Sequence, residues 1–308
     1  MNYEYAMRAD NVYVIDTMMF GFEHYMSAFL VKGRELALID TGLPDQLEAV
    51  RAGIKKHGFS VQDLSYIFAT HEHQDHTGNV APLLRENPNI RFFCHPLAAP
   101  FVMDPSLEDT NRKQNLPPHM AARFAKMEPV PQDRINHLTD GDVFDLGNGE
   151  KLRIHFAPGH QPSGVVLFAE KNGGLFIHDL VGNCFADCNF QLILNPPRSD
   201  LRQAMTSLAM FKNTPASRLF MGHFGISDNP RHVIQRAIES MQELMDIGAK
   251  CIAEGNPDEL IPRIYAYKML EVEKLKARGK ALYEYQGKEL AASQARLFAE
   301  YYLSTQHH

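Results

Sequence analysis

Three histidines and one aspartate lie within a stretch of six residues, at His71, His73, Asp75 and His76. Imidazole nitrogen and carboxylate oxygen are ligands that borderline divalent metals bind together. In an extended chain alternate side chains share a face, so His71 and His73 can approach one cation, whereas a turn would direct Asp75 and His76 elsewhere. Once ligands from distant parts of the chain join, these four groups exceed one tetrahedral shell, which favours two metal ions.

The segments on either side of this motif support a metal site. Residues 66–69 form an apolar run that predicts a buried strand, and residues 80–87 predict a helix. The alternative is a polar loop that is merely rich in histidine, since the chain contains 15 histidines. The density of the pattern and its place between a strand and a helix favour the metal site.

Much of the remaining chain alternates between strand and helix patterns. This rhythm predicts an α/β fold class with a layered architecture. The expected strands are residues 11–16, 25–31, 35–40, 90–94, 143–146, 151–157, 165–169, 175–179 and 218–221, and further helices are expected at 44–57 and 200–212.

Two segments depart from this rhythm. Residues 96–132 contain several prolines between apolar, methionine-containing pieces, with a short helix expected over 119–127. Such an insertion serves as a lid over a site or is a plain surface excursion. From residue 229 onward the apolar positions follow helical stripes. We therefore predict a domain over 1–228, with 96–132 as a lid, and a helical extension over 229–308.

Composition excludes several classes of function. The formal charge of −6 and the lack of a Lys/Arg block disfavour nucleic-acid binding. Four scattered cysteines form no disulfide framework, and we expect Cys184 and Cys188 to be free thiols rather than a metal or redox pair. No apolar run reaches the roughly 20 residues of a membrane span, and the first residues do not resemble a secretory signal. We expect a cytoplasmic protein.

Three further candidate ligands follow expected strands at distant points of the chain. His160 and His223 each follow a glycine, and Asp179 follows His178. A strand end can hold a ligand rigidly enough for metal coordination. Taken in this order after the first motif, these residues resemble the metallo-β-lactamase superfamily of binuclear hydrolases. Residues 27–42 also resemble the opening hairpin of that family.

The resemblance implies a complete ligand set and a fold. One metal is expected at His71, His73 and His160, a second at Asp75, His76 and His223, with Asp179 bridging both. Asp40 corresponds to a carboxylate that fixes the tautomer of a ligand. His178 has no matching role and is expected to be structural. The implied fold is an αββα sandwich, and the implied cofactors are two divalent metal ions, zinc first, with iron or manganese as alternatives.

The resemblance also implies a reaction. Two cations that share a water lower its pKa, so that hydroxide can attack a polarised carbonyl or phosphoryl group near neutral pH. Asp75 would steer the nucleophile or accept its proton. The ligand set is similar to that of glyoxalase II-like thioesterases, lactonases and phosphodiesterases, and the helical tail resembles glyoxalase II and the quinolone-signal response proteins. We expect hydrolysis of a small thioester, ester or lactone.

Other functions stay open at this point. One alternative is a phosphodiesterase or RNA-processing hydrolase, and another is a ligand-sensing regulatory protein whose metal site is mainly structural. Flavodiiron oxygen reductases have a carboxylate where this chain has His73, and the commonest penicillin-cleaving members use a cysteine in place of the bridging aspartate. A small molecule is the expected partner, with His24 or Tyr25 contacting it, and a homodimer is also considered.

Overall fold

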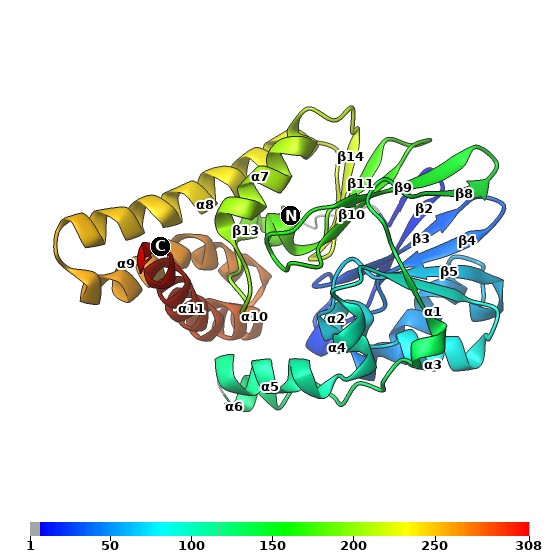
Figure 1. Cartoon of the computed structure of the whole chain (residues 1–308), viewed down its shortest axis with the longest axis horizontal. Helices are drawn as coiled ribbons and strands as arrows, with labels where there is room; N and C mark the ends of the chain where they lie inside the picture. Colours follow the sequence, from blue (N-terminus) through cyan, green and yellow to red (C-terminus); the bar gives the residue numbers. More distant parts are fainter. Residues whose placement is uncertain (1–6, 117, 308) are drawn as a thin grey trace.

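The computed structural model describes residues 7–116 and 118–307, and two β-sheets form its centre (Figure 1). The first has seven strands in sequence order, of which β1 to β4 are antiparallel and β4 to β7 parallel. These strands are β1 (Arg8–Ala9), β2 (Val12–Asp16), β3 (Ser27–Lys32), β4 (Leu36–Ile39), β5 (Leu64–Phe68), β6 (Arg91–Cys94) and β7 (Ile135–His137).

The second sheet has six strands in the order β15-β14-β11-β10-β9-β8, and only β11 and β14 run parallel. They are β8 (Val143–Gly147), β9 (Glu150–Phe156), β10 (Val165–Ala169), β11 (Gly174–Phe176), β14 (Arg218–Met221) and β15 (Gly225–Ser227). A separate antiparallel hairpin lies between β11 and β14 in the sequence and consists of β12 (Asn183–Phe185) and β13 (Phe190–Leu192).

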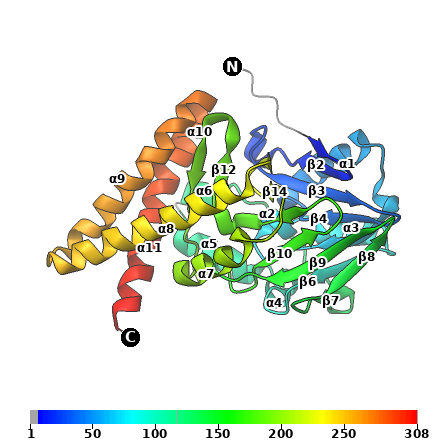
Figure 2. The ribbon, with the colours of Figure 1, turned by 90° about the horizontal axis from the view of Figure 1, so that it is seen from above.

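The two sheets pack face to face with helices on both outer faces (Figure 2). Apolar residues of both sheets form one core, where Phe29 of β3 contacts Phe176 and Phe220 at ring-centroid distances of 5.3 and 5.6 Å. Alternate residues of the first sheet point the other way, onto α1 (Leu47–Lys56) and α3 (Val80–Glu86). The second sheet packs on α7 (Leu201–Lys212) and α8 (Pro230–Ala253). The predicted αββα sandwich is confirmed.

The insertion at 96–132 contains more helix than its sequence suggests. Its helices are α4 (Ala99–Met103), α5 (Ser106–Asn115) and α6 (Pro118–Ala121). The helix expected over 119–127 is therefore wrong in position, because only α6 forms there and the chain then turns away. Helix α5 was missed because its sequence, SLEDTNRKQN, has a single large apolar residue and so shows no apolar stripe.

The helical extension packs onto the second sheet rather than standing apart. It consists of α8, α9 (Leu260–Val272), α10 (Lys280–Glu284), a π-helical segment (Tyr285–Leu290) and α11 (Ala291–Ser304). Ile234 of α8 and Phe298 of α11 share one core with Ile177 and Leu219 of the sheet region. Helix α8 begins at Pro230, one residue after the predicted start of the extension at 229. The division of the chain into two domains stays a prediction.

One glycine places a candidate ligand through close packing. Gly159 follows β9, has φ +146°, and its carbonyl accepts a hydrogen bond from the Asp200 N–H at 2.7 Å. A Cβ at this position would lie 2.3 Å from Cα of Ala204 in α7. Only glycine allows this approach, and His160 is the next residue along the chain.

Replacing Gly159 with alanine should therefore destabilise the protein and displace His160. We expect Gly159→Ala to lower the free energy of unfolding by about 1–3 kcal/mol, because a methyl group is forced against the backbone of α7. Urea unfolding and zinc titration would measure both effects. Gly141→Ala is the control, since Gly141 also has positive φ but no atom within 4 Å of the added Cβ. Equal effects of the two substitutions would contradict the packing explanation.

Candidate metal centre

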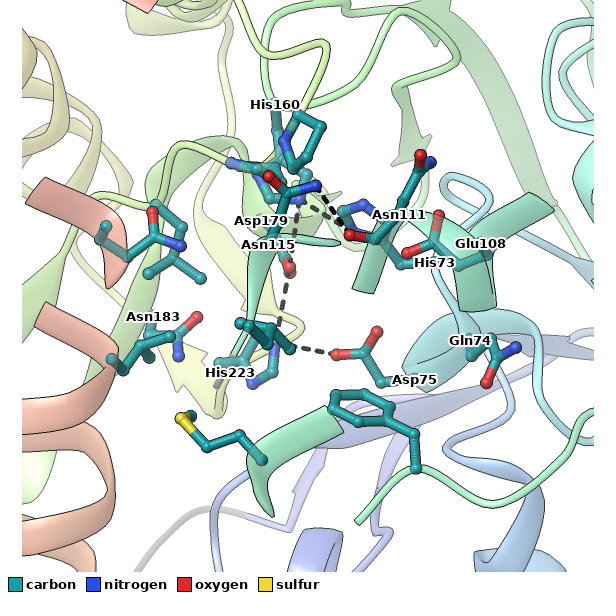
Figure 3. Close-up of a pocket in the computed structure, with 18 of the residues that line it drawn as sticks. His73, Gln74, Asp75, Glu108, Asn111, Asn115, His160, Asp179, Asn183 and His223 are labelled. Carbon is teal, nitrogen blue, oxygen red and sulfur yellow. Dashed lines mark hydrogen bonds and ion pairs between the residues drawn. The ribbon is translucent and has the colours of Figure 1, made fainter. Parts of the chain in front are cut away.

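Seven predicted ligands converge at one edge of the sandwich, where several strands end. Figure 3 shows five of them, His73, Asp75, His160, Asp179 and His223. His71 and His73 follow β5, and the short helix α2 (Gln74–Thr77) carries Asp75 and His76. His160 follows β9 and His223 follows β14, while Asp179 lies in a 3₁₀ helix (His178–Val181) after β11. The structure thus brings together residues that are up to 152 positions apart in sequence.

The first cluster contains three imidazoles and one carboxylate. The Nε2 atom of His71 lies 2.9 Å from Nδ1 of His73, and Nε2 of His160 lies 3.2 Å from that same Nδ1. Asp179 Oδ2 is 3.5 Å from His160 Nε2. The ligand atoms of these four residues lie within 4.8 Å of one another. This group could hold one metal ion with nitrogen and oxygen ligands.

The second cluster shares Asp179 with the first. Nε2 of His76 lies 3.4 Å from Asp179 Oδ1, and Nε2 of His223 lies 3.5 Å from Asp179 Oδ2. Asp75 Oδ2 is 3.5 Å from His223 Nε2 and 3.9 Å from His76 Nε2. These four residues also keep their ligand atoms within 4.8 Å. The carboxylate of Asp179 therefore stands between two groups of possible ligands.

Asp40 orients one imidazole of the second cluster, as the sequence suggested. Its carboxylate accepts a hydrogen bond from His76 Nδ1 at 2.7 Å and from the Thr70 N–H at 2.9 Å. His223 is oriented in the same way, because its Nδ1 lies 3.2 Å from the carbonyl oxygen of Tyr25. With Nδ1 occupied, Nε2 of each ring presents its lone pair to the cluster.

Glu72 has a structural role that the sequence analysis did not anticipate. It lies between two ligand histidines in sequence, but alternate residues point to opposite sides, so its buried carboxylate faces away from them. It pairs with Arg198 at 2.8 Å and accepts a hydrogen bond from Ser163. The Arg198 guanidinium also lies 4.5 Å from the ring centroid of Phe101 in the insertion. Glu72 thus connects the loop that carries His71 and His73 to the segments that contain Ser163 and Arg198.

A family model described as the metallo-beta-lactamase superfamily matches residues 22–223, about two thirds of the chain. The chain belongs to this superfamily. Its members are mostly metal-dependent hydrolases, and the matched region contains all seven clustered residues. The metal-binding expectation is thereby supported at the level of the superfamily.

Individual relatives are distant and match only in part. The lactamase-like protein nscB of Arthroderma gypseum is 30% identical over 153 residues, which cover 48% of this chain and 37% of that protein. A putative diflavin flavoprotein of Nostoc is 25% identical over 52% of this chain and 24% of its own length. The beta-lactamase-like protein 2 homolog of Caenorhabditis elegans is 25% identical over 67% of this chain and 58% of its own length. The matches thus span well under two thirds of these relatives.

Solved structures of the superfamily share the fold. A metallo-beta-lactamase family protein from Thermus thermophilus aligns over 96% of this chain and 94% of its own, with a TM-score of 0.62 and 17% identity. An archaeal superfamily protein from Sulfolobus tokodaii gives the same TM-score over 76% of this chain and 87% of its own, at 20% identity. The first of these alignments extends through the helical extension as well as the sandwich.

A pocket of about 950 Å³, its open mouth included, lies over the edge of the sandwich where the candidate ligands gather. Its floor includes His73, Asp75, Asp179 and other clustered residues. Three separate segments supply apolar walls: the loop after β2, the insertion, and helix α11 with the π-helical segment before it. Their apolar side chains are Met19, Phe20, Leu116, Met120, Phe124, Leu290 and Leu297.

The two residues suggested as substrate contacts differ in position. The side chain of Tyr25 is buried, lines the pocket and packs edge-on against His223 at a centroid distance of 5.6 Å. His24 does not line the pocket. Its backbone N–H donates to Asp16 at 2.8 Å, and its ring lies 5.1 Å from that of Phe224. The structure therefore gives no support for a substrate contact by His24.

The remaining expectations concern cysteines and His178. The four cysteines are free thiols, Cys184 being buried and Cys188 half-buried, so no disulfide joins them. His178 is buried beside Asp179, and burial lowers its pKa to about 3, so the ring is neutral. No helix in residues 7–116 and 118–307 is long and apolar enough to cross a membrane.

The two clusters differ in protonation before a metal binds. Burial holds the pKa values of His71 and His160 well below their ordinary value, so their lone pairs are available at neutral pH. Burial also disfavours the charged forms of His76 and His223, but nearby carboxylates outweigh it. Asp179 and its neighbours raise the pKa of His76 well above its usual range and that of His223 to about 9. Protons therefore compete with a cation mainly at the second cluster.

This difference predicts two distinct steps of metal uptake. Binding at the second cluster must displace protons from His76 and His223, so its affinity should rise with pH up to about pH 9. The affinity of the first cluster should change little between about pH 7 and 9, because His71 and His160 are already neutral there. Calorimetric zinc titrations in buffers of different ionisation enthalpy would count the protons released. Equal proton release in both steps would contradict this assignment.

Removing the negative charge of Asp40 should weaken the second cluster selectively. We expect Asp40→Asn to lower the affinity of one of two zinc equivalents about 10- to 100-fold, because the amide no longer fixes His76 in the required tautomer. Equilibrium dialysis against a zinc chelator would measure both affinities. Asp142→Asn is the control, since its exposed carboxylate only accepts a hydrogen bond from the Thr139 N–H. Unchanged binding in Asp40→Asn would refute the role given to Asp40.

Proposed function

We propose that this protein is a hydrolase that cleaves a small thioester, ester or lactone at a centre of two divalent metal ions. The observation that carries the proposal is the position of the pocket. Both ligand clusters contribute to one pocket whose walls are mainly apolar, because five of their seven residues line it: His73, Asp75, His160, Asp179 and His223. A small acyl compound fits such a pocket, with its carbonyl group at the floor and its alkyl part against the walls.

The residues present fit two metal ions. Every candidate ligand offers an imidazole nitrogen or a carboxylate oxygen, as zinc, iron and manganese accept. Nε2 of His76 and Oδ1 of Asp179 are buried 3.4 Å apart, and neither makes a hydrogen bond of good geometry among the described residues. A cation bound beside both atoms would take the place of the proton that His76 otherwise holds. Two divalent cations held here would supply Lewis acidity and would lower the pKa of a water molecule between them.

The chain's own groups would orient the reacting atoms. Although burial acts to raise the pKa of Asp75, the neighbouring His76 and His223 lower it, so this carboxylate is ionised at neutral pH. It lines the pocket floor, where it can accept a hydrogen bond from a water molecule and later hold a proton. The ring of Tyr25 and the apolar walls exclude bulk water from the acyl group.

The walls favour acyl substrates over phosphodiesters. None of the described lysine or arginine side chains lines the pocket, and Glu108 is one of its lining residues. A phosphodiester or an RNA strand carries negative charge along its length and is normally met by basic side chains. The formal charge of −6 also disfavours binding of such a negatively charged substrate. The diflavin-type redox alternative is disfavoured by His73, which occupies a position where the flavodiiron enzymes have a carboxylate.

We further propose that the insertion acts as a lid. Helix α5 supplies Glu108, Asn111 and Asn115 to the lining of the pocket, and its last residue contacts α11. The carbonyl of Asn115 accepts hydrogen bonds from Ser293 Oγ at 2.9 Å and Arg296 Nη2 at 3.0 Å. His119 and Glu289 form an exposed ion pair at 2.5 Å. These few polar contacts can break and re-form while the sandwich stays folded.

The proposed activity is tested with the zinc-loaded protein and a panel of acyl thioesters, aliphatic esters, lactones and an aryl phosphodiester. We expect turnover of at least one acyl class, with kcat/KM at least about 100-fold above that of the phosphodiester, because the pocket lacks basic residues. Chelation should abolish turnover, and added zinc should restore it. Metal-independent turnover, or preference for the phosphodiester, would overturn the proposal. Tight binding of an acyl compound without turnover would instead favour the ligand-sensing function.

A further inference from the structure

Two carboxamide side chains in the pocket carry buried oxygen atoms that have no partner. Asn183 is 2% exposed and Gln74 is 1% exposed, and each lines the pocket. Asn183 Oδ1 and Gln74 Oε1 are buried without a hydrogen bond in the described part of the chain. A buried acceptor without a hydrogen bond raises the free energy of the ligand-free protein, and a ligand that donates a hydrogen bond to it removes this free-energy cost.

The two amides differ in how firmly their side chains are held. Gln74 donates from Nε2 to Asp109 Oδ1 at 3.1 Å, which fixes its side chain to the insertion. Among the described residues no hydrogen bond engages either end of the Asn183 amide. Its oxygen and its nitrogen are therefore both free to meet a ligand.

The backbone of Asn183, in contrast, is fixed beside the metal ligands. Asn183 begins β12 and pairs with Leu192 of β13. The next residue, Cys184, donates its N–H to the carbonyl of His223 at 2.5 Å and accepts from the Phe224 N–H at 2.7 Å. Figure 3 shows the Asn183 side chain next to His223, on the opposite side of Asp75 from Gln74. A ligand at the floor of the pocket would reach Asn183 within a few bonds of its reacting carbonyl.

The composition of the walls specifies what Asn183 would recognise. Apart from the histidines of the ligand clusters, the pocket has no described lysine or arginine to pair with an anion, but its polar positions include several carboxamides, among them Asn111, Asn115 and Gln294. Carboxamides exchange hydrogen bonds with neutral amide and hydroxyl groups without requiring charge on the ligand. An amide group flanked by alkyl parts would satisfy both the polar positions and the apolar walls.

We propose that Asn183 is a specificity-determining residue that accepts a hydrogen bond from a secondary amide in an uncharged acyl substrate, close to the scissile carbonyl. This inference rests on the proposed hydrolase function and narrows its substrate class. Binding costs no charge desolvation, because neither the pocket amide nor the substrate amide is ionised. Substrates without the N–H donor leave Asn183 Oδ1 unpaired and bind less well.

The test uses two thioesters that differ in one hydrogen-bond donor. They are the butanoyl thioester of N-acetylcysteamine and that of N-acetyl-N-methylcysteamine, which keeps the carbonyl but lacks the N–H. We expect the zinc-loaded protein to prefer the first by about tenfold in kcat/KM, as a buried neutral hydrogen bond would give. In Asn183→Leu, of similar volume, the ratio should fall close to one while the bound zinc is unchanged. Asn111→Leu, which removes another carboxamide of the pocket, should keep the tenfold ratio.

A binding measurement separates this inference from the hydrolase proposal. The corresponding pair of ketones, in which a methylene group replaces the thioester sulfur, cannot be hydrolysed and can be titrated calorimetrically. A tenfold difference in Kd that disappears in Asn183→Leu supports the inference even if neither thioester is turned over, and the hydrolase proposal then fails separately if the whole panel of acyl compounds is also not hydrolysed. Turnover with no preference in the wild-type protein, or a preference that survives in Asn183→Leu, overturns the inference alone. No turnover and no difference in Kd overturns both.

Discussion

The buried carboxylate of Asp179 is the constraint on which the rest of the site depends. It lies within 3.5 Å of imidazole nitrogens from two separate clusters, so both clusters must be placed relative to one short 3₁₀ helix. Five histidines and two aspartates are packed within a few ångströms of one another around this carboxylate. Such an arrangement is poor for a protein core and suitable for metal binding, because a divalent cation can accept imidazole and carboxylate lone pairs together.

The fold supplies this constraint through strand ends. Strands β5, β9, β11 and β14 come from both sheets, yet the residues that follow them meet at one edge because the sheets pack face to face. Packing therefore fixes the ligand positions more firmly than any loop sequence does. Gly159 shows how tight the fit is, since its backbone lies against α7 with no room for a side chain. Asp40 and the carbonyl of Tyr25 then set the ring orientations of His76 and His223.

Much of this arrangement could be predicted from sequence, and the failures have clear physical causes. The first group, His71 to His76, was identifiable from its residue types and spacing, whereas His160, Asp179 and His223 were identified through the family resemblance. The order of strands and helices in the sandwich was readable from apolar periodicity. Helix α5 could not be predicted, because its polar sequence gives no apolar stripe. Asn183 could not be singled out either, because one asparagine near a candidate ligand is a common turn residue. The sequence could not separate His24 from Tyr25 as substrate contacts, because only the structure shows that Tyr25 lines the pocket while the ring of His24 lies beside Phe224.

The roof and the floor of the pocket have separate origins in the chain. The floor comes from strand ends of the sandwich, whereas much of the opposite wall, here called the roof, comes from α5, α6 and α11, which carry none of the clustered histidines and aspartates. Selection can therefore alter substrate preference in one part of the gene while the chemical machinery is inherited unchanged. Related proteins with this sandwich could evolve different substrate specificities through changes in the roof helices alone.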